Sequence, residues 1–188
     1  MDARARRSLE RLSTAVLDLA GRKAPETLSV SEVARVAGVH RSTFYEHSDS
    51  PSELLRTVLR TELDAVRERH LGGQAPPDVA LQVHQTTLEV LEHLERHRAV
   101  YLRSFASPSD ASLRTMLGEH VRASVLLLLE RGAVTSPVGD RALAAQYLAE
   151  GAVGALSVWL AGPAPRSAEA FLADYARLVP PWWPSIEG

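Results

Sequence analysis

The amino-acid sequence predicts an all-α fold, and three features indicate it. Nearly every segment places its apolar residues three or four positions apart, which is the spacing of one helix face. No segment shows the sustained apolar–polar alternation of a half-buried strand. Capping residues, glycines and prolines divide the chain into about nine helices. With 188 residues, the chain can form one substantial core or one small and one medium domain.

The three N-terminal helices are predicted from stripes and caps. Ser29 and Glu32 form a capping box for a second helix over 30–37, and Gly38 supplies the left-handed residue that stops it. A short third helix covers about 40–46. A first helix precedes them, ends at Gly21 and carries an apolar stripe that consists of Leu9, Leu12, Val16 and Leu19.

The fourth helix begins with a strong start signal. Ser50 is a capping residue, Pro51 suits the first turn, and Glu53 completes the box, so a long helix should run from here to about Leu71. The segments GGQAPP, SPSD and GAVTSPVGD are predicted breaks. Further helices are expected at about 78–97, 99–105, 111–131, 141–160 and 168–178.

Charge divides the chain mildly. Residues 1–48 contain eight Lys/Arg and six Asp/Glu, a net charge of +2, whereas residues 49–188 carry −4. The sign suits an N-terminal part, 1–48, that meets a polyanion and a second part, 49–188, that does not. The absence of cysteine excludes disulfides, thiolate chemistry and Cys-ligated metals.

The N-terminus is basic but lacks the apolar core of a signal peptide. The most apolar stretch, around 151–165, is broken by Gly162, Pro163 and Pro165 and is shorter than the roughly 20 residues that span a bilayer. A cytoplasmic protein with no membrane partner is therefore expected.

Residues 29–47 have the composition of a helix-turn-helix. Ala34 is small where two helices would cross, and Gly38 permits a tight turn. The apolar residues that can pack together are Val30, Val33, Ala37, Val39 and Phe44. This packing leaves polar residues facing outward on a rod that fits a major groove: His40, Arg41, Ser42, Thr43, Tyr45 and His47. A small helical hairpin with a solvated face is the alternative.

The same stretch resembles the DNA-binding domain of TetR-family transcriptional regulators. The resemblance covers about residues 5–55, and beyond them only the number and length of the helices agree. The residues that carry it are Val30, Val33, Ala34, Ala37-Gly38-Val39, Ser42-Thr43-Phe44-Tyr45 and His47.

The resemblance implies roles for residues of the third helix. Thr43, Tyr45 and His47 match positions that usually contact the DNA backbone, and Arg41 and Ser42 match positions that often read bases. A palindromic double-stranded operator and a homodimer follow from it.

Other positions of the same unit either match the family or depart from it. Ser29 and Ser31 lie where the family meets phosphate. His40 stands where a capping Ser or Thr is common, so the start of the third helix should be less well fixed. Ser50-Pro51-Ser52 replaces a frequent Lys, which removes one expected phosphate contact.

The dimer surface is expected in the last two helices, about 141–160 and 168–178, as in the resembled family. Between Tyr147 and Leu160 only Glu150 is charged, so the eighth helix is apolar on more than one side. Gly151, Gly154 and Ala155 would let a partner helix approach closely. Complete burial of this helix within its own subunit is the alternative.

The resemblance also implies a small-molecule effector in the second domain. Its pocket candidates are mixed polar and apolar residues on inward faces, and ordinary core is the alternative for each: His84, Thr87, Tyr101, Phe105, Met116, His120 and Trp159. Few of them are charged, so an apolar or aromatic effector with one or two hydrogen-bonding groups is expected.

No cofactor, metal or catalytic motif is expected. His93 and His97 have metal-ligand spacing, but their charged neighbours indicate a solvated face. Residues 4–7 could be a disordered tail or contact the DNA backbone, and the role of Trp182-Trp183 is open.

Three functions therefore remain in view. The first is a ligand-released homodimeric repressor. The others are an all-helical binder or enzyme with structural N-terminal helices, and a DNA-binding protein without an inducer.

Overall fold

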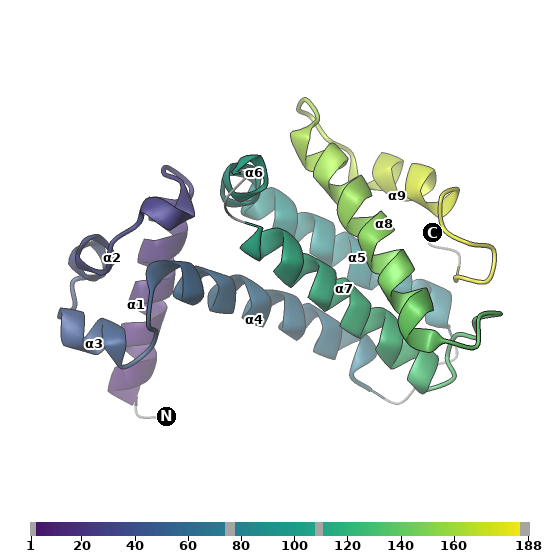
Figure 1. Cartoon of the computed structure of the whole chain (residues 1–188), viewed down its shortest axis with the longest axis horizontal. Coiled ribbons are helices and arrows are strands. Elements are labelled where there is room, and N and C mark those ends of the chain that lie inside the picture. Colours follow the sequence, from purple (N-terminus) through teal and green to yellow (C-terminus); the bar gives the residue numbers. More distant parts are fainter. Residues whose placement is uncertain (1–2, 74–77, 108–110, 185–188) are drawn as a thin grey trace. The chain divides into compact units, whose positions relative to one another are not determined.

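The computed structural model describes residues 3–73, 78–107 and 111–184, and all regular structure within these ranges is helical (Figure 1). The elements are α1 (Ala3–Ala20), η1 (Pro25–Thr27), α2 (Val30–Ala37), α3 (Arg41–Tyr45), α4 (Pro51–Leu71), α5 (Val79–Arg96), α6 (Arg98–Ala106), α7 (Ser112–Glu130), α8 (Arg141–Ala161) and α9 (Ala168–Ala176). The predicted all-α fold is confirmed. The predicted breaks at 72–77 and 107–110 fall largely outside the described residues.

The chain packs as two compact units. Unit 1 comprises residues 1–61 and 97–114, and unit 2 comprises residues 62–96 and 115–188. The helices α4 and α7 each contribute residues to both units. The division into two functional domains at residue 48 stays a prediction. The packing divides the chain differently, because α6 belongs to unit 1 together with the N-terminal helices.

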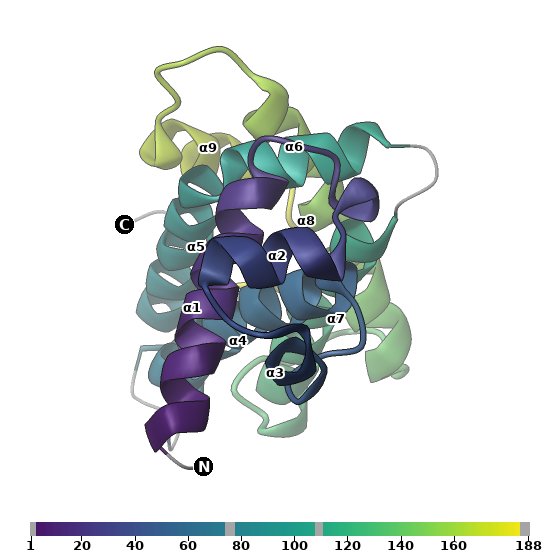
Figure 2. The same cartoon turned by 90° about the vertical axis from the view of Figure 1, so that its left-hand side faces the viewer.

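Unit 1 is built on the apolar stripe of α1. Leu12 and Val16 are fully buried, and α2 packs across α1 through Val33, Ala34 and Ala37 (Figure 2). The short η1, which the sequence did not predict, contacts α6. Side chains of α6 support the same region, because Arg103 Nε donates to the carbonyl oxygen of residue 21 at 3.1 Å.

The helix ends of unit 1 have the capping groups that the sequence predicts. Ser29 accepts a hydrogen bond from the backbone N–H of Glu32 at 3.2 Å, and Ser50 accepts one from Glu53 at 3.2 Å. Gly38 has φ 63° and ψ 42°, and its N–H bonds to carbonyls of the last turn of α2. The positive φ is the reason this position favours glycine, since a Cβ there would meet only the mobile end of the Arg11 side chain, at 2.5 Å.

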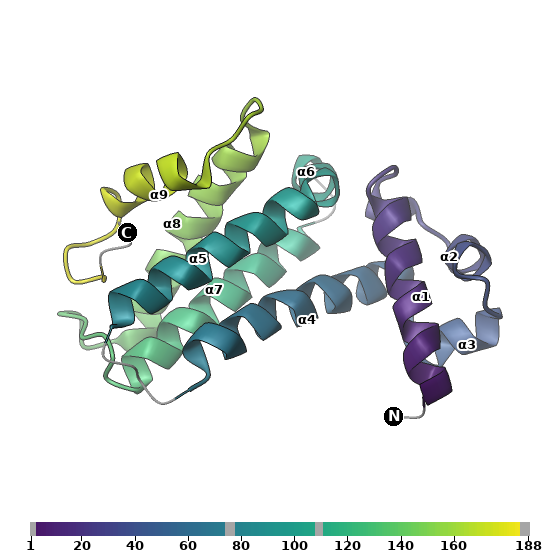
Figure 3. The ribbon, with the colours of Figure 1, turned by 180° about the vertical axis from the view of Figure 1, so that it is seen from behind.

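Unit 2 gathers the end of α4 with α5, most of α7, α8 and α9, and α9 packs against α5 (Figure 3). Arg131, after the end of α7, donates to the carbonyl oxygens of Leu71, Gly72 and Gly73 and so satisfies the C-terminus of α4. Arg166, between α8 and α9, makes a bidentate pair with Glu95 of α5 at 2.5 and 3.0 Å.

The long helix α8 corrects one expectation. Within the part of the chain that the structure describes, α8 is long and apolar enough to cross a membrane by length and composition, so the expectation that this stretch is too short was wrong. The expectation counted only the most apolar residues, 151–165, whereas the helix that contains most of them runs for 21 residues from Arg141. A core helix has the same properties, and one face of α8, including Leu148 and Leu156, is buried in unit 2.

His93 corrects another expectation. It does not lie on a solvated face: its side chain is only 2% exposed, and Nδ1 lies 3.1 Å from Glu62 Oε2. The charged neighbours along α5 misled the prediction, because a helix turns His93 away from Glu92 by about 100°.

Candidate functional site

The helix α3 presents polar side chains to solvent and is anchored by one aromatic ring. Phe44 is fully buried, whereas Tyr45 is 53% exposed, and their rings meet edge to face at 5.8 Å. Arg41 and Ser42 are exposed and Thr43 is half-buried. The structure therefore places the predicted base-reading and backbone-contacting residues of α3 on an accessible surface.

The flanking candidates differ in how accessible their polar atoms are. Ser29 and Ser31 are exposed at the start of α2. His40 is exposed and is the N-cap of α3, but its side chain makes no capping hydrogen bond, as the sequence suggests for this position. In His47, which is half-buried, the Nε2 atom is buried without a hydrogen-bond partner among the described residues.

A basic groove adjoins α3, and the sequence identified only part of it. Arg4, Arg7 and Arg11 lie on one stripe of α1 and line the groove together with His40 and Thr43. Residues 4–7 are helical rather than a disordered tail. The spacing of three and four residues from Arg4 to Arg11 was the signal that could have revealed a basic face on α1.

Unit 2 contains a cavity of about 100 Å³. Its lining is mainly aliphatic and includes no charged side chain among the described residues: Leu71, Val83, Thr86, Thr87, Val90, His120, Val121, Ser124, Val125, Leu128, Leu148, Ala152, Leu156, Phe171, Tyr175 and Trp183. Every lining residue belongs to unit 2. Such an apolar cavity with a few polar groups is typical of a small-molecule site.

Of the seven ligand candidates from the sequence, Thr87 and His120 line this cavity. The other five lie elsewhere. Tyr101 is fully buried in unit 1, where its ring meets Phe105 at 5.8 Å. In unit 2, Met116 is a core residue with 2% exposure.

The remaining candidates also stay outside the cavity lining. His84 is half-buried on α5. Trp159 contacts the ring of Phe171 at 5.8 Å, and its indole Nε1 is buried without a partner among the described residues. Sequence reasoning missed Phe171 and Tyr175, which stack at 5.5 Å with an interplanar angle of 11°. The sequence did not indicate a role for Trp183, and the structure places it in the cavity wall.

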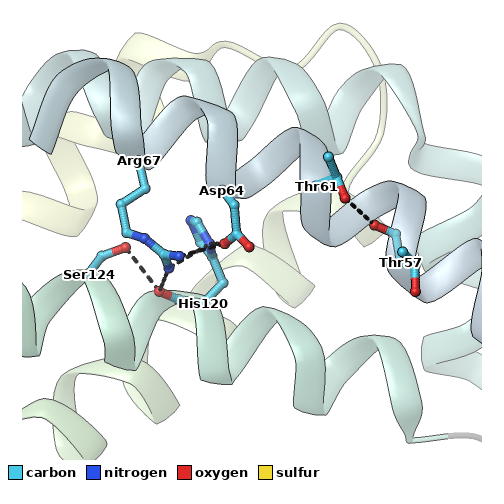
Figure 4. A network of polar contacts seen from close by, with 6 residues as sticks. All are labelled: Thr57, Thr61, Asp64, Arg67, His120 and Ser124. Carbon is cyan, nitrogen blue, oxygen red and sulfur yellow. Dashed lines mark hydrogen bonds and ion pairs between the residues drawn. The ribbon is translucent and has the colours of Figure 1, made fainter. Parts of the chain in front are cut away.

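His120 connects the cavity wall to α4 (Figure 4). Its Nδ1 lies 3.3 Å from Asp64 Oδ1 and 3.3 Å from Arg67 Nη1. Arg67 and Asp64 form an ion pair of 2.6 Å along α4. The carbonyl oxygen of His120 accepts from Ser124 Oγ at 2.9 Å.

Burial keeps two polar groups of the cavity uncharged. Burial and the nearby Arg67 guanidinium lower the pKa of His120 from 6.5 to about 4, although Asp64 opposes the shift. Burial raises the pKa of Tyr175 to about 12. At neutral pH the cavity therefore offers a neutral imidazole and a neutral phenol.

Three of the four hydroxyl groups in the described wall are already used as donors. Thr86 donates to the carbonyl oxygen of Gln82 at 2.7 Å, and Thr87 donates to that of Val83 at 2.7 Å. Ser124 donates to the carbonyl oxygen of His120. Because each hydroxyl has one hydrogen, these three can only accept further hydrogen bonds.

Comparison with curated proteins finds a partial relative. No family model matches the chain. The chain is 26% identical over 92 residues to the uncharacterized HTH-type transcriptional regulator YxbF of Bacillus subtilis, a stretch that covers 48% of this chain and 24% of that protein. The chain thus matches about a quarter of the length of this relative.

Similar solved structures cover nearly the whole chain. The dihydroxyacetone kinase operon activator DhaS has a TM-score of 0.67 at 15% identity and covers 91% of this chain and 93% of its own. The TetR-family repressor FadR of Thermus thermophilus, in complex with lauroyl-CoA, has a TM-score of 0.63 at 19% identity, with coverages of 90% and 92%.

NalD, the secondary repressor of the MexAB-OprM multidrug efflux pump in Pseudomonas aeruginosa, has a TM-score of 0.63 at 18% identity and covers 97% of this chain and 100% of its own. Activators and repressors are therefore both present among the similar structures. The chain has the fold of the TetR-family transcriptional regulators.

Proposed function

We propose that this protein is a homodimeric, DNA-binding transcriptional regulator whose binding to an operator responds to a small molecule. The observation that carries the proposal is the surface of α3, where Arg41, Ser42 and Tyr45 are exposed while Phe44 fixes the helix from within.

DNA binding is further supported by the distribution of charge. Arg4, Arg7 and Arg11 of α1 line the groove next to α3. Their charges lie where they can neutralise phosphates on either side of a groove that α3 enters. Arg41, near the start of α3, suits a bidentate contact with guanine.

A dimer through α8 and α9 is supported by exposed apolar side chains on α8. Leu143 is 60% exposed, Tyr147 65% and Val158 76%. They lie on one face of the helix with Gly151 and Gly154, where an added Cβ would meet no other atom within unit 2. Such a stripe is costly in water and suits close approach of a second copy.

The effector site is assigned to the cavity of unit 2. Its lining suits an apolar or aromatic molecule with one or two hydrogen-bonding groups. Asp64 and Arg67 of α4 adjoin His120 in the cavity wall, and the N-terminal half of α4 belongs to unit 1. A shift of α4 on ligand binding would change the spacing of the two α3 helices in the dimer.

The test is selection of bound DNA from a random pool, followed by sedimentation of the free protein. The proposal predicts a palindrome with half-sites about one DNA turn, roughly 34 Å, apart. It also predicts a dimer at micromolar concentration, which Tyr147→Glu should dissociate. No enriched sequence, or a monomer at this concentration, would contradict it.

A further inference from the structure

The hydrogen-bonding groups of the cavity wall are mostly acceptors. The hydroxyls of Thr86, Thr87 and Ser124 can accept but have no hydrogen left to donate. These three oxygens therefore offer acceptors, and Tyr175 is the one hydroxyl of the wall among the described residues that can also donate. A ligand that donates can use the three acceptors, and a ligand that only accepts cannot.

The neutral His120 ring has one hydrogen to place on two nitrogens. Nδ1 lies at the same distance, 3.3 Å, from a carboxylate oxygen of Asp64 and from a guanidinium nitrogen of Arg67. With the hydrogen on Nδ1, the ring donates to Asp64 and Nε2 is an acceptor. With the hydrogen on Nε2, Nδ1 accepts from Arg67 and Nε2 is a donor.

We infer that the effector is a neutral apolar or aromatic molecule with a hydroxyl group, which donates to Nε2 of His120 while Nδ1–H donates to Asp64 of α4. The inference rests on the proposed function in treating this cavity as the effector site. It adds the chemical class of the effector and the contact through which its binding reaches α4.

Three observations favour this direction of the hydrogen bonds. No hydrogen bond to Nε2 of His120 is present among the described residues, and His120 lines the cavity. Both arrangements at Nδ1 are charge-assisted, but Arg67 Nη1 also donates to the carbonyl oxygen of His120 at 3.5 Å, so Arg67 keeps a hydrogen bond when Nδ1 carries the hydrogen. The lowered pKa of His120 keeps the ring neutral, so Nε2 carries no hydrogen in that tautomer.

The arrangement also has a consequence for α4. Binding of the hydroxyl holds the ring to Asp64 and releases Arg67 from Nδ1, while Arg67 keeps its ion pair with Asp64 at 2.6 Å. A ligand that only accepts selects the opposite arrangement. Two ligands of the same shape can therefore have different effects on the same helix.

The test compares three ligands of similar shape on the full chain without DNA: 4-ethylphenol, its methyl ether and 4-ethylbenzoate. Binding is measured by calorimetry and by tryptophan fluorescence, since Trp183 lies in the cavity wall. The phenol should bind about tenfold more tightly than the ether, the loss expected for one buried hydrogen bond between neutral groups. The benzoate should bind most weakly, since the wall has no charge to offset its own.

Two His→Phe variants distinguish the loss of the ligand contact from a general loss of structure. His120→Phe should abolish the preference for phenol over ether. His93→Phe changes another buried histidine that also faces a carboxylate and does not line the cavity, so it should keep the preference. Nitrogen-15 NMR of the unsubstituted protein should show Nδ1–H as the main tautomer with phenol bound.

Equal or tighter binding of the ether or the benzoate would overturn the inference, as would no binding of the phenol or a bound tautomer with Nε2–H. Operator binding by the ligand-free protein is measured separately by gel shift. If operator binding is present and the phenol fails, only the effector class is wrong. If operator binding is absent and the phenol preference holds, the regulatory function is wrong.

Discussion

The polar residues of α3 in unit 1 and those of the cavity in unit 2 have opposite surroundings. Tyr45 is 53% exposed on a helix of five residues, and the ring of Phe44 beside it is fully buried. His120 is 4% exposed, and its Nδ1 lies beside side chains of another helix. An exposed polar surface thus needs only a rigid local support, whereas a cavity needs several helices to enclose it.

The largest effect on stability is expected from Phe44, the buried residue that anchors α3. Replacing Phe44 by Ala should destabilise the protein by about 3–5 kcal/mol, because it removes a fully buried ring and leaves a cavity. Urea denaturation measures this change. The neighbouring Tyr45→Phe is the control and should change stability by less than about 0.5 kcal/mol. If both variants lost a similar amount of stability, the claim that the buried Phe44 supports α3 and the exposed Tyr45 does not would be wrong.

The second prediction concerns the pH dependence of stability, which tests whether burial keeps His120 neutral. The unfolded chain protonates His120 near the ordinary histidine pKa of 6.5, but in the folded protein burial lowers the pKa to about 4. Falling pH therefore favours unfolding in this window, and stability should decline by about 2 kcal/mol between pH 8 and pH 5 from His120 alone.

The measurement is urea denaturation of the unsubstituted protein and of His120→Phe at both pH values. The difference between their free energies of unfolding should change by this amount, since other titrating groups contribute equally to both. Parallel pH dependences for the two proteins would show that His120 is not held neutral by burial.

A smaller effect is expected at the start of α3. His40 has the extended backbone of an N-cap, with φ −74° and ψ 154°, but gives no side-chain hydrogen bond to the helix. His40→Ser should therefore raise stability by about 0.5–1 kcal/mol, and His40→Ala should not. Thermal unfolding would detect the difference, and equal melting temperatures for the two variants would contradict it.

Much of unit 1 could be predicted because its signals are local. Ser29 and Gly38 mark the two ends of α2. The start signal at Ser50 predicts a helix to about Leu71, and α4 has these bounds. The burial of Phe44 between the more accessible Ser42 and Tyr45 follows from the helix period alone.

The cavity could not be predicted in the same way, since its wall brings together residues far apart in the chain. Phe171, Tyr175 and Trp183 come from α9 and the residues after it, and nothing in their local pattern relates them to Thr86. Tyr101 shows the converse: its mixed character suggested a ligand site, but it is fully buried in the core of unit 1. Burial depends on tertiary packing that a helical stripe does not specify.

The most direct test of the central claim is the affinity of Arg41→Ala for the selected operator and for a scrambled duplex, at one fixed salt concentration. If the exposed face of α3 reads DNA, the variant should lose about 1–3 kcal/mol on the operator and much less on the scrambled duplex, while Tyr45→Phe should weaken both alike. Operator affinity that is unchanged in both variants, with the fold intact, would contradict the account.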